Sequence, residues 1–338
     1  MVAIEVLHSM KLRARGNDGN VALKLDISKA YDRMDWEYLR EVMVKMGFEN
    51  QWIQWMCMCV ESVDYSVLVS NEIVGPIILG RGLRKGNPLS PYLFIIGAEG
   101  LSSLIRDAED RGIISGVKVC RSAPSVSHLL SADDCFLFFK AEESQAQVMK
   151  SILTIYEEAS GQAISLPKSE IYCSRNVPDP IKQSITAFLG VQAVLGTGKY
   201  LGLPSMVGRD RNSTFAYIKD RVWQKINSRG SKCLSKAGRE VMIKSILQAI
   251  PSYVMSIFQL PTTLINTIEK MINSFWWGHG RTSHCGINWL NWEKLSMHKN
   301  HGGMGFKDLT AFNLSMLGKQ GWKFQTEPDT LVSRIFKA

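Results

Sequence analysis

The segment His128-Leu-Leu-Ser-Ala-Asp-Asp-Cys-Phe-Leu-Phe-Phe139 places two adjacent aspartates, Asp133 and Asp134, between two apolar runs. These runs predict a buried β-hairpin with the aspartates at its turn. An ordinary β-turn would explain the pair, because Asp is a common turn residue. Carboxylates between buried strands are nevertheless costly unless a positive partner meets them. The usual partner of a carboxylate cluster with open coordination positions is Mg²⁺.

A second strand favours the metal site over the simple turn. Residues 21–27, Val-Ala-Leu-Lys-Leu-Asp-Ile, form an apolar run that carries one lone carboxylate, Asp26. Three carboxylates at two strand ends are a suitable ligand set for a hard divalent cation. The sequence therefore predicts a Mg²⁺ site, with Mn²⁺ as the alternative ion, formed by Asp26, Asp133 and Asp134.

Composition predicts a soluble intracellular chain, in either the nucleus or the cytoplasm. The chain has 338 residues, of which 45% are hydrophobic, which is enough for two or three structural units. Its seven cysteines are scattered and indicate neither a disulfide framework nor a four-ligand zinc site. No apolar run approaches 18 residues, and residues 1–16 lack the charged-then-apolar order of a signal peptide, so we expect neither a signal peptide nor a membrane partner.

The net charge of +9 is unevenly divided along the chain. Residues 191–338 hold 20 Lys and Arg against 8 Asp and Glu, and residues 191–250 hold 11 against 3. This asymmetry predicts a surface that binds a polyanion through its phosphates, although a solvated helix face would have the same composition. The candidate binding residues are Arg209, Arg211, Lys219, Arg221, Lys225, Arg229, Lys232, Lys236, Arg239 and Lys244.

Periodicity predicts an α+β fold with a largely antiparallel sheet, because strands and helices mix without a regular βαβ order. We expect helices over 36–47, 91–110, 143–159, 211–228, 235–249 and 262–277, and strands over 65–69, 73–79, 113–119 and 169–173 beside the two carboxylate segments. Gly161 should end the third helix, and Ser235 should cap the fifth. The last part, residues 281–338, is rich in aromatic residues and glycine and suggests a truncated element.

Several short motifs occur in one order along the chain. They are Lys24–Asp32, the basic glycine-rich loop Arg81–Pro91, Ala132–Asp134, Gly161–Ser169, Tyr200–Pro204, Leu234–Arg239, Phe275–Gly278 and Gly302–Phe306. Together they resemble the reverse transcriptases of LINE-type, non-LTR retrotransposons, in particular the degenerate or truncated copies found in plants. The resemblance covers nearly the whole chain.

This resemblance implies a right-hand polymerase with an antiparallel palm. Residues 1–190 would be the palm with partial fingers, 191–280 a basic helical thumb, and 281–338 the truncated C-terminal segment. The function implied is RNA-directed DNA polymerase activity by two-metal nucleotidyl transfer, with an RNA template, a DNA primer and dNTPs as partners.

The resemblance also assigns roles to individual residues. Asp26 and Asp133 would bind two Mg²⁺ ions, and Asp134 would add charge to the same site. Tyr31 would lie under the incoming sugar and reject a 2′-hydroxyl, while Gly86 would let its loop approach the new base pair. Lys168 would protonate the departing pyrophosphate. The alternative for Tyr31 is an ordinary core tyrosine, and the alternative for Lys168 is a solvated loop residue.

Three positions depart from the family pattern. Ser131 stands where an aromatic residue usually precedes the paired aspartates, and Lys85 and Asn87 replace Gln and Asp in the glycine-rich loop. Lys85 can contact a phosphate but cannot reproduce the paired donor and acceptor of an amide. Because the chain also opens only about 25 residues before Asp26, we expect most of the fingers and the endonuclease to be missing. The predicted polymerase is therefore impaired or inactive.

Two other functions use the same residues. The first is a non-catalytic nucleic-acid-binding remnant of a retroelement, in which the basic region persists without a working palm. The second is a metal-dependent phosphohydrolase, a class that commonly adds histidine ligands. The six histidines show no ligand pairing with the aspartates.

Overall fold

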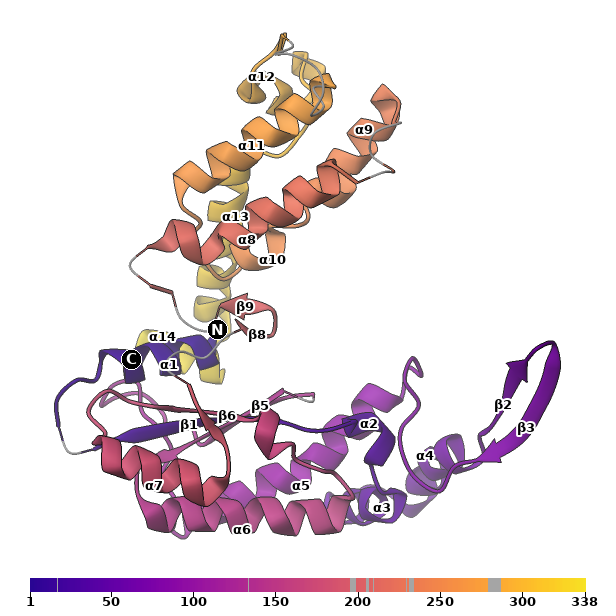
Figure 1. Ribbon diagram of the computed structural model, residues 1–338, viewed down its shortest axis with the longest axis vertical. Coiled ribbons are helices and arrows are strands. Elements are labelled where there is room, and N and C mark those ends of the chain that lie inside the picture. Colours follow the sequence, from indigo (N-terminus) through magenta and orange to yellow (C-terminus); the bar gives the residue numbers. More distant parts are fainter. Residues whose placement is uncertain are drawn as a thin grey trace. The chain divides into compact units, whose positions relative to one another are not determined.

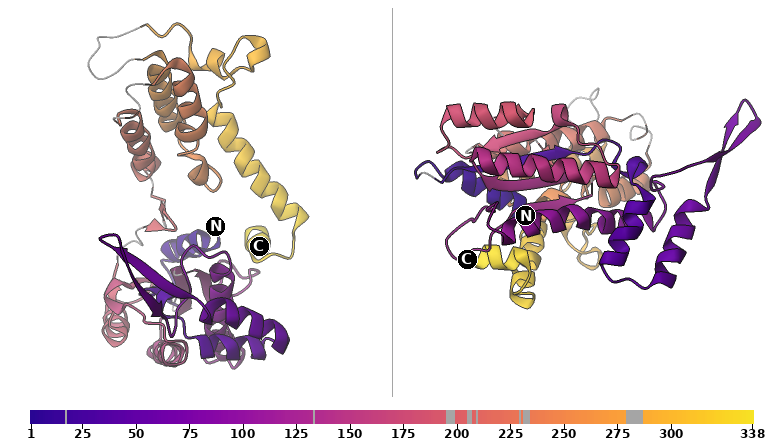
Figure 2. Two further views of the ribbon diagram at one scale, coloured as in Figure 1. Left: turned by 90° about the vertical axis from the view of Figure 1, so that its right-hand side faces the viewer. Right: turned by 90° about the horizontal axis from the view of Figure 1, so that it is seen from below.

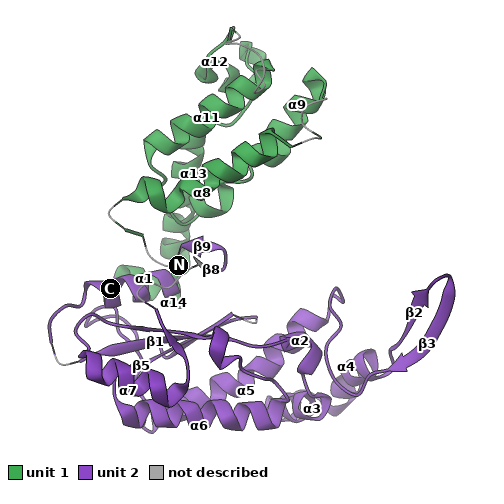
Figure 3. Cartoon of the chain, in the orientation of Figure 1, with its two compact units in different colours: residues 1, 207–337 green, residues 2–206, 338 purple. Residues whose placement is uncertain are grey.

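The computed structural model describes residues 1–16, 18–132, 134–194, 199–204, 207–208, 210–228, 230, 234–278 and 287–338. The chain divides into two compact units, coloured separately in Figure 3. The sheet unit comprises Val2–Met206 with Ala338, and the helical unit comprises Met1 with Val207–Lys337.

A five-stranded sheet organises the sheet unit, with β1 at its centre. In spatial order the strands are β4 (His128–Ser131), β5 (Asp134–Lys140), β1 (Asn20–Asp26), β6 (Glu170–Cys173) and β7 (Gln192–Ala193). β1 is antiparallel to both β5 and β6, and only the β6–β7 pair is parallel. The predicted α+β class with a largely antiparallel sheet is confirmed.

The two faces of the sheet carry different side chains, because successive residues of a strand point to opposite sides. Leu23, Leu25 and Leu137 belong to the main hydrophobic core, which they share with helices α5 (Ser90–Asp110) and α6 (Glu143–Ser160). Both helices lie on one side of the sheet, and α1 (Val2–Leu12) lies on the other (Figures 1 and 2). Burial of the apolar face is the main stabilising term of such a layer.

Shorter elements complete the sheet unit. They are α2 (Ala30–Arg33), α3 (Trp36–Lys45), α4 (Asn50–Glu61), the 3₁₀ helix η1 (Leu166–Lys168), α7 (Asp179–Leu189), and the two-stranded pairs β2 (Asp64–Val69) with β3 (Glu72–Ile78) and β8 (Lys199–Tyr200) with β9 (Leu203–Pro204). The β2–β3 hairpin projects from the rest of the unit beyond α4 (Figures 1 and 2). A register shift between Tyr65 and Val67 interrupts its pairing.

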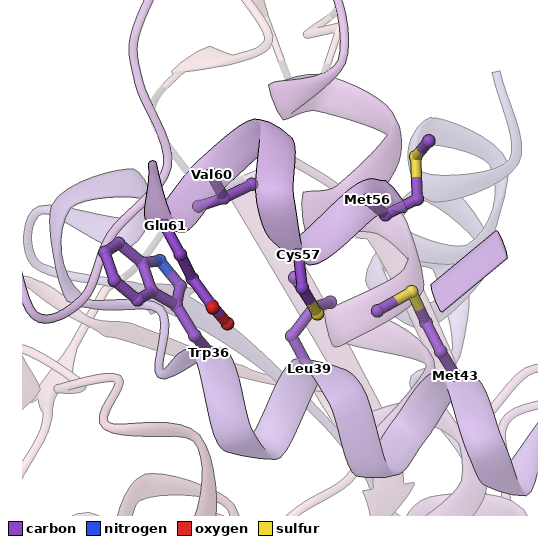
Figure 4. A pocket seen from close by; sticks show the side chains of 7 residues that line it. All are labelled: Trp36, Leu39, Met43, Met56, Cys57, Val60 and Glu61. Carbon is purple, nitrogen blue, oxygen red and sulfur yellow. The ribbon is translucent and has the colours of Figure 1, made fainter. Parts of the chain in front are cut away.

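Helices α3 and α4 face each other across a small apolar space (Figure 4). Leu39 and Met43 from α3 meet Cys57 from α4, and the enclosed volume is about 10 Å³. That volume holds at most about one water molecule. Because the space is so small, we interpret it as imperfect helix packing and not as a ligand site.

The helical unit contains no strand among its described residues. Its elements are α8 (Arg211–Ile226), α9 (Lys236–Met242), the π-helix η3 (Ile243–Leu247), α10 (Ser252–Met255), α11 (Thr262–Trp277), α12 (Trp292–Ser296), the 3₁₀ helix η4 (Lys299–His301), α13 (Leu309–Thr326) and α14 (Leu331–Lys337). Asn313 is buried in α13. Its side-chain amide donates hydrogen bonds to the carbonyls of Met255 and Phe258 and accepts one from the Leu260 N–H. None of the helices in the described ranges is both long and apolar enough to cross a membrane.

Most expected elements agree with the structure within a few residues. Gly161 ends α6 with a left-handed backbone, and the Ser235 side chain caps α9, as predicted. The expected strand over 113–119 is wrong, because only an isolated bridge joins Val117 to Val126 there. The expected helix over 235–249 is interrupted, since α9 gives way to the π-helix η3.

Candidate active site

Asp26 and Asp134 lie at directly opposite positions of neighbouring strands. Asp26 ends β1, Asp134 begins β5, and the antiparallel register pairs the two residues. Directly opposite residues project to the same face, with Cβ atoms roughly 4.5–5.5 Å apart. The structure therefore brings these two predicted ligands together. The third, Asp133, lies outside the described residues.

The backbone turns sharply close to both carboxylates. Ala132 has a φ of 52° in the turn between β4 and β5, and Lys29 has a φ of 50° before α2. The left-handed region is uncommon for residues other than glycine, and such conformations cluster at functional sites. The turn at Lys29 follows Asp26, and the turn at Ala132 precedes Asp134, each by only a few residues. Both turns therefore shape the end of the sheet that carries the carboxylates.

The segment that carries Lys168 is fastened to the backbone of Asp26. The Asp26 carbonyl accepts a hydrogen bond from the Ser165 N–H at 2.8 Å, and the Asp26 N–H donates to Ser169 Oγ at 3.2 Å. Ser169 is buried, and its hydroxyl also donates to the Ser165 carbonyl at 2.9 Å. Lys168 is exposed between these two serines in η1. Sequence reasoning assigned Lys168 but missed the serines that position it.

The glycine-rich loop is held against α2 by backbone hydrogen bonds. The Leu83 N–H donates to the Tyr31 carbonyl at 2.6 Å, and the Gly82 N–H donates to the Met34 carbonyl at 2.8 Å. A Cβ on Gly82 would lie 2.7 Å from the Asp32 carbonyl oxygen, so only glycine permits this close approach. These contacts bring the predicted nucleotide loop beside the C-terminal end of the motif Lys24–Asp32.

Tyr31, Lys85 and Gly86 each have a defined setting within this loop region. The half-buried ring of Tyr31 stacks on Phe94 with centroids 4.8 Å apart. Lys85 Nζ lies 3.3 Å from Asp32 Oδ2, and both side chains are largely exposed. Gly86 has a φ of +87°, and the space that a Cβ would occupy is open to 4 Å, so its backbone angle and not crowding favours glycine.

Two further residues share the face that carries the carboxylates. Ser131 pairs directly with Asp134 across the hairpin, so the aromatic expected from the family pattern is replaced by a small hydroxyl next to the site. Lys24 lies two residues before Asp26 in β1 and therefore projects to the same side. The lysine places a positive charge about 7 Å along the strand from Asp26. The alternation of β1 was the signal that could have identified Lys24.

This arrangement suits a divalent cation. Two carboxylates at directly opposite positions repel each other, and carboxylate oxygens are the preferred ligands of Mg²⁺. Within the described ranges, no group of three or more His, Cys, Asp or Glu side chains is placed to hold a metal ion. Because Asp133 is outside those ranges, the predicted three-carboxylate set stays a prediction.

His128 occupies β4, three residues before Ser131. Its Nε2 lies 2.8 Å from Ser102 Oγ, and its Nδ1 lies 3.1 Å from Ser127 Oγ. Burial, with a smaller effect from Arg106, lowers the pKa of His128 below its ordinary value. Both ring nitrogens are thus engaged by serine hydroxyls, which gives this histidine a structural role beside the hairpin.

The predicted nucleic-acid-binding residues of the helical unit fall into two groups. On α8, Arg211, Arg221 and Lys225 are exposed, and Lys219 is half-buried. Arg221 and Lys225 are four residues apart and share one helix face. Arg209, Arg229 and Lys232 lie outside the described residues.

The remaining three cations make contacts within the helical unit. Lys236 Nζ lies 4.6 Å from the centre of the Trp276 ring and donates to the Trp276 carbonyl at 3.1 Å. Arg239 also reaches that carbonyl, at 3.4 Å. Lys244 lies 2.7 Å from Glu240, whose pKa is lowered by hydrogen bonds from Lys244 and Lys299. These contacts engage the three cations within the helical unit, whereas Arg211, Arg221 and Lys225 of α8 are exposed.

Comparison with known proteins identifies the family. The model of the reverse transcriptase (RNA-dependent DNA polymerase) family matches residues 3–193, which include the carboxylate strands, the glycine-rich loop and η1. The chain belongs to the reverse transcriptase family. Similarity to proteins of transposon TX1 and of the type-1 retrotransposable element R2 confirms the predicted LINE-type, non-LTR relationship.

Three curated relatives illustrate this similarity. An uncharacterized 149 kDa protein of transposon TX1 from Xenopus laevis is 24% identical over 290 residues, covering 84% of this chain and 21% of the relative. A retrovirus-related Pol polyprotein from the type-1 retrotransposable element R2 of Popillia japonica is 26% identical over 207 residues, covering 58% and 32%. An uncharacterized mitochondrial protein of Arabidopsis thaliana is 50% identical over 67 residues, covering 20% and 55%. The chain thus spans 21% to 55% of the length of these relatives.

We predict that Ser169→Ala loosens the Asp26 strand end. The change leaves the Asp26 N–H without its acceptor, which should cost about 1–3 kcal/mol of unfolding free energy. Urea unfolding measures the loss, and hydrogen exchange at the Asp26 amide should accelerate. Ser151→Ala is the matched control, because the exposed Ser151 hydroxyl donates to the Gln147 carbonyl within its own helix, α6. Equal effects of the two changes would contradict the assigned role of Ser169.

Proposed function

We propose that the chain is the RNA-directed DNA polymerase domain of a non-LTR retroelement, with nucleotidyl transfer at the carboxylate end of β1 and β5 and with reduced activity. The proposal rests chiefly on the register that pairs Asp26 with Asp134. It also uses the family match over residues 3–193. Residues 1–190 would include the palm, and the basic helical residues 191–280 would serve as the thumb.

Divalent ions fit the proposed site, and the family generally uses them. Asp26, Asp133 and Asp134 would supply the oxygen ligands. When bound, Mg²⁺ or Mn²⁺ would favour ionisation of the primer 3′-hydroxyl and balance the charge of the triphosphate. Lys24 would reduce the repulsion among the carboxylates when no ion is present, because it projects to the same face as Asp26.

Protein residues would orient the substrates around this centre. Phe94 fixes the plane of Tyr31 by stacking, so the tyrosine could serve as a rigid floor for the sugar of a dNTP. Lys168 would carry a proton to the departing pyrophosphate from the segment that Ser165 and Ser169 fasten to Asp26. Positioning of this kind is a major source of rate enhancement.

Two departures from the family pattern support reduced activity. Lys85 is paired with Asp32 and cannot act as an amide toward the base pair. Ser131 lies next to Asp134 and offers no aromatic surface beneath the primer end. The loss of one well-placed active-site donor can cost on the order of 10²–10³ in rate.

A second candidate function is nucleic-acid binding without catalysis. The observation that favours it is the exposed cationic face of α8, formed by Arg211, Arg221 and Lys225. Such a face would contact phosphates without reading bases. RNA template and DNA primer would then be ligands of the helical unit regardless of the state of the palm.

We expect templated primer extension by the unmodified chain to be weak with either Mg²⁺ or Mn²⁺. The variant Lys85→Gln/Ser131→Phe should extend the primer faster, because it restores an amide in the loop and an aromatic beside Asp134. Adding Asp26→Asn should lower that activity by at least about 100-fold. Lys45→Gln removes the same positive charge as Lys85→Gln, from an exposed position on α3, and is the control for the loop change. Extension that survives Asp26→Asn would contradict the carboxylate site, and robust synthesis by the unmodified chain would contradict the impairment.

Duplex binding tests the α8 face separately. Fluorescence anisotropy should show an affinity that falls with salt, and Arg211→Gln/Arg221→Gln/Lys225→Gln should reduce the slope of log affinity against log salt by up to about 2.7, or 0.9 for each lost DNA phosphate contact. The control removes three exposed lysines from other helices, Lys270, Lys294 and Lys319. An equal change in both triple variants would mean that net charge, and not the α8 face, drives binding.

A further inference from the structure

A polar basin of about 580 Å³ opens at the end of the sheet away from Asp26. Asn20 begins β1 and lines this basin, whereas Asp26 ends the strand. Six residues of strand separate the two positions by roughly 20 Å. The basin is therefore distinct from the proposed polymerase site, although both belong to the sheet unit.

Positive charge predominates around the basin. Four cations line it, Arg13, Lys118, Arg121 and Lys140, against two carboxylates, those of Asp18 and Glu109. The carboxylates are partly engaged, because Glu109 accepts a hydrogen bond from Ser125 Oγ at 2.8 Å and Asp18 lies 3.9 Å from Lys140 Nζ. The remaining charge favours an anionic ligand.

Asn20 supplies a second and independent indication of a ligand. The residue is 3% exposed, and its Nδ2 has no hydrogen-bond partner among the described residues. Leaving a buried donor unpaired is costly, and most such groups in proteins find an acceptor. Asn20 pairs directly with Lys140 across β1 and β5, so the amide and the lysine project to the same face.

The walls of the basin are fixed by hydrogen bonds within the protein. Gln145 is buried, and its Oε1 accepts from the backbone N–H groups of Ser115 at 3.1 Å and Lys140 at 3.2 Å. The Arg13 guanidinium donates to the Lys118 carbonyl at 3.3 Å, which joins the α1 end to the opposite wall. A rigid, cationic surface of this kind loses little entropy when it binds an anion.

The part of the lining that the structure describes contains no aromatic side chain. A nucleobase would therefore find no stacking surface here, and recognition of a strand by its bases is unsupported. Arginine and lysine with an amide donor suit the oxygens of a phosphate group. We propose that this basin binds phosphate groups, with Asn20 Nδ2 as the donor at its floor and Arg13, Arg121 and Lys140 as the charged donors. A free phosphate compound and a nucleic-acid strand both present this chemistry.

Cys120 provides a direct readout, because it lines the basin and is half-buried. A hydrogen bond with the Ser122 hydroxyl, at 3.3 Å, lowers the pKa of this thiol and favours the reactive thiolate. Cys59 is exposed on α4 and lies outside the basin, so it serves as the internal control. Alkylation by iodoacetamide can be followed at both cysteines by peptide mapping.

We expect inorganic pyrophosphate, at low ionic strength and without divalent ions, to slow alkylation of Cys120 and to leave Cys59 unchanged. Arg13→Gln/Arg121→Gln should raise the pyrophosphate concentration that gives half protection by roughly tenfold or more. The control variant Lys45→Gln/Lys182→Gln loses the same charge, on α3 and α7. It should leave the pyrophosphate concentration for half protection unchanged. Asn20→Leu should also weaken the protection of Cys120, without a change of charge. If Asn20→Leu does not fold, the result for Arg13→Gln/Arg121→Gln decides whether the basin binds pyrophosphate.

Two oligonucleotides distinguish the source of the phosphate. Protection by a single strand regardless of its 5′ end would assign the site to phosphodiesters of a nucleic acid. Protection only by pyrophosphate or by a 5′-phosphorylated strand would assign it to terminal or free phosphates. Either result supports phosphate binding in the basin. No protection of Cys120, equal protection of Cys59, or equal weakening by the arginine and lysine variants would overturn the proposal.

Discussion

The antiparallel register of β1 and β5 is the constraint on which the proposed active site depends. It aligns Asp26 with Asp134, and a shift of one residue would send the two carboxylates to opposite faces of the sheet. The same register buries Leu23, Leu25 and Leu137 against α5 and α6. Hydrophobic burial on one face thus places the two carboxylates opposite each other on the other face, and carboxylate oxygens are the ligands that divalent cations prefer.

The sequence was sufficient to predict the helices and strands that have strong local sequence signals. Apolar runs predicted the strands around Asp26 and Asp134, and Gly161 and Ser235 marked helix ends through their backbone and capping chemistry. The α+β class followed from the irregular order of strands and helices. The strand expected over 113–119 failed because its apolar residues do not find a continuous partner, and only the Val117–Val126 bridge forms.

The supporting contacts of the site could not be predicted, because they join segments far apart in the sequence. The hydrogen bond between the Asp26 N–H and Ser169 Oγ joins residues 143 positions apart in the sequence, and no local sequence pattern predicts it. Lys236 and Arg239 contributed to a basic composition, but their contacts with Trp276 appear only in the folded helical unit. Composition reports the number of charges, whereas the fold decides which of them face outward.

Binding of Mn²⁺, followed by the loss of free-ion signal in electron paramagnetic resonance, tests the central claim directly. The paired carboxylates should bind Mn²⁺ in competition with Mg²⁺, and Asp26→Asn or Asp134→Asn should weaken binding by roughly tenfold or more, since each removes a charged ligand. Asp179→Asn, an exposed change on α7, should leave the affinity unchanged. Equal Mn²⁺ affinity in the wild-type chain and in the two site variants would contradict the metal site and, with it, the proposed nucleotidyl transfer.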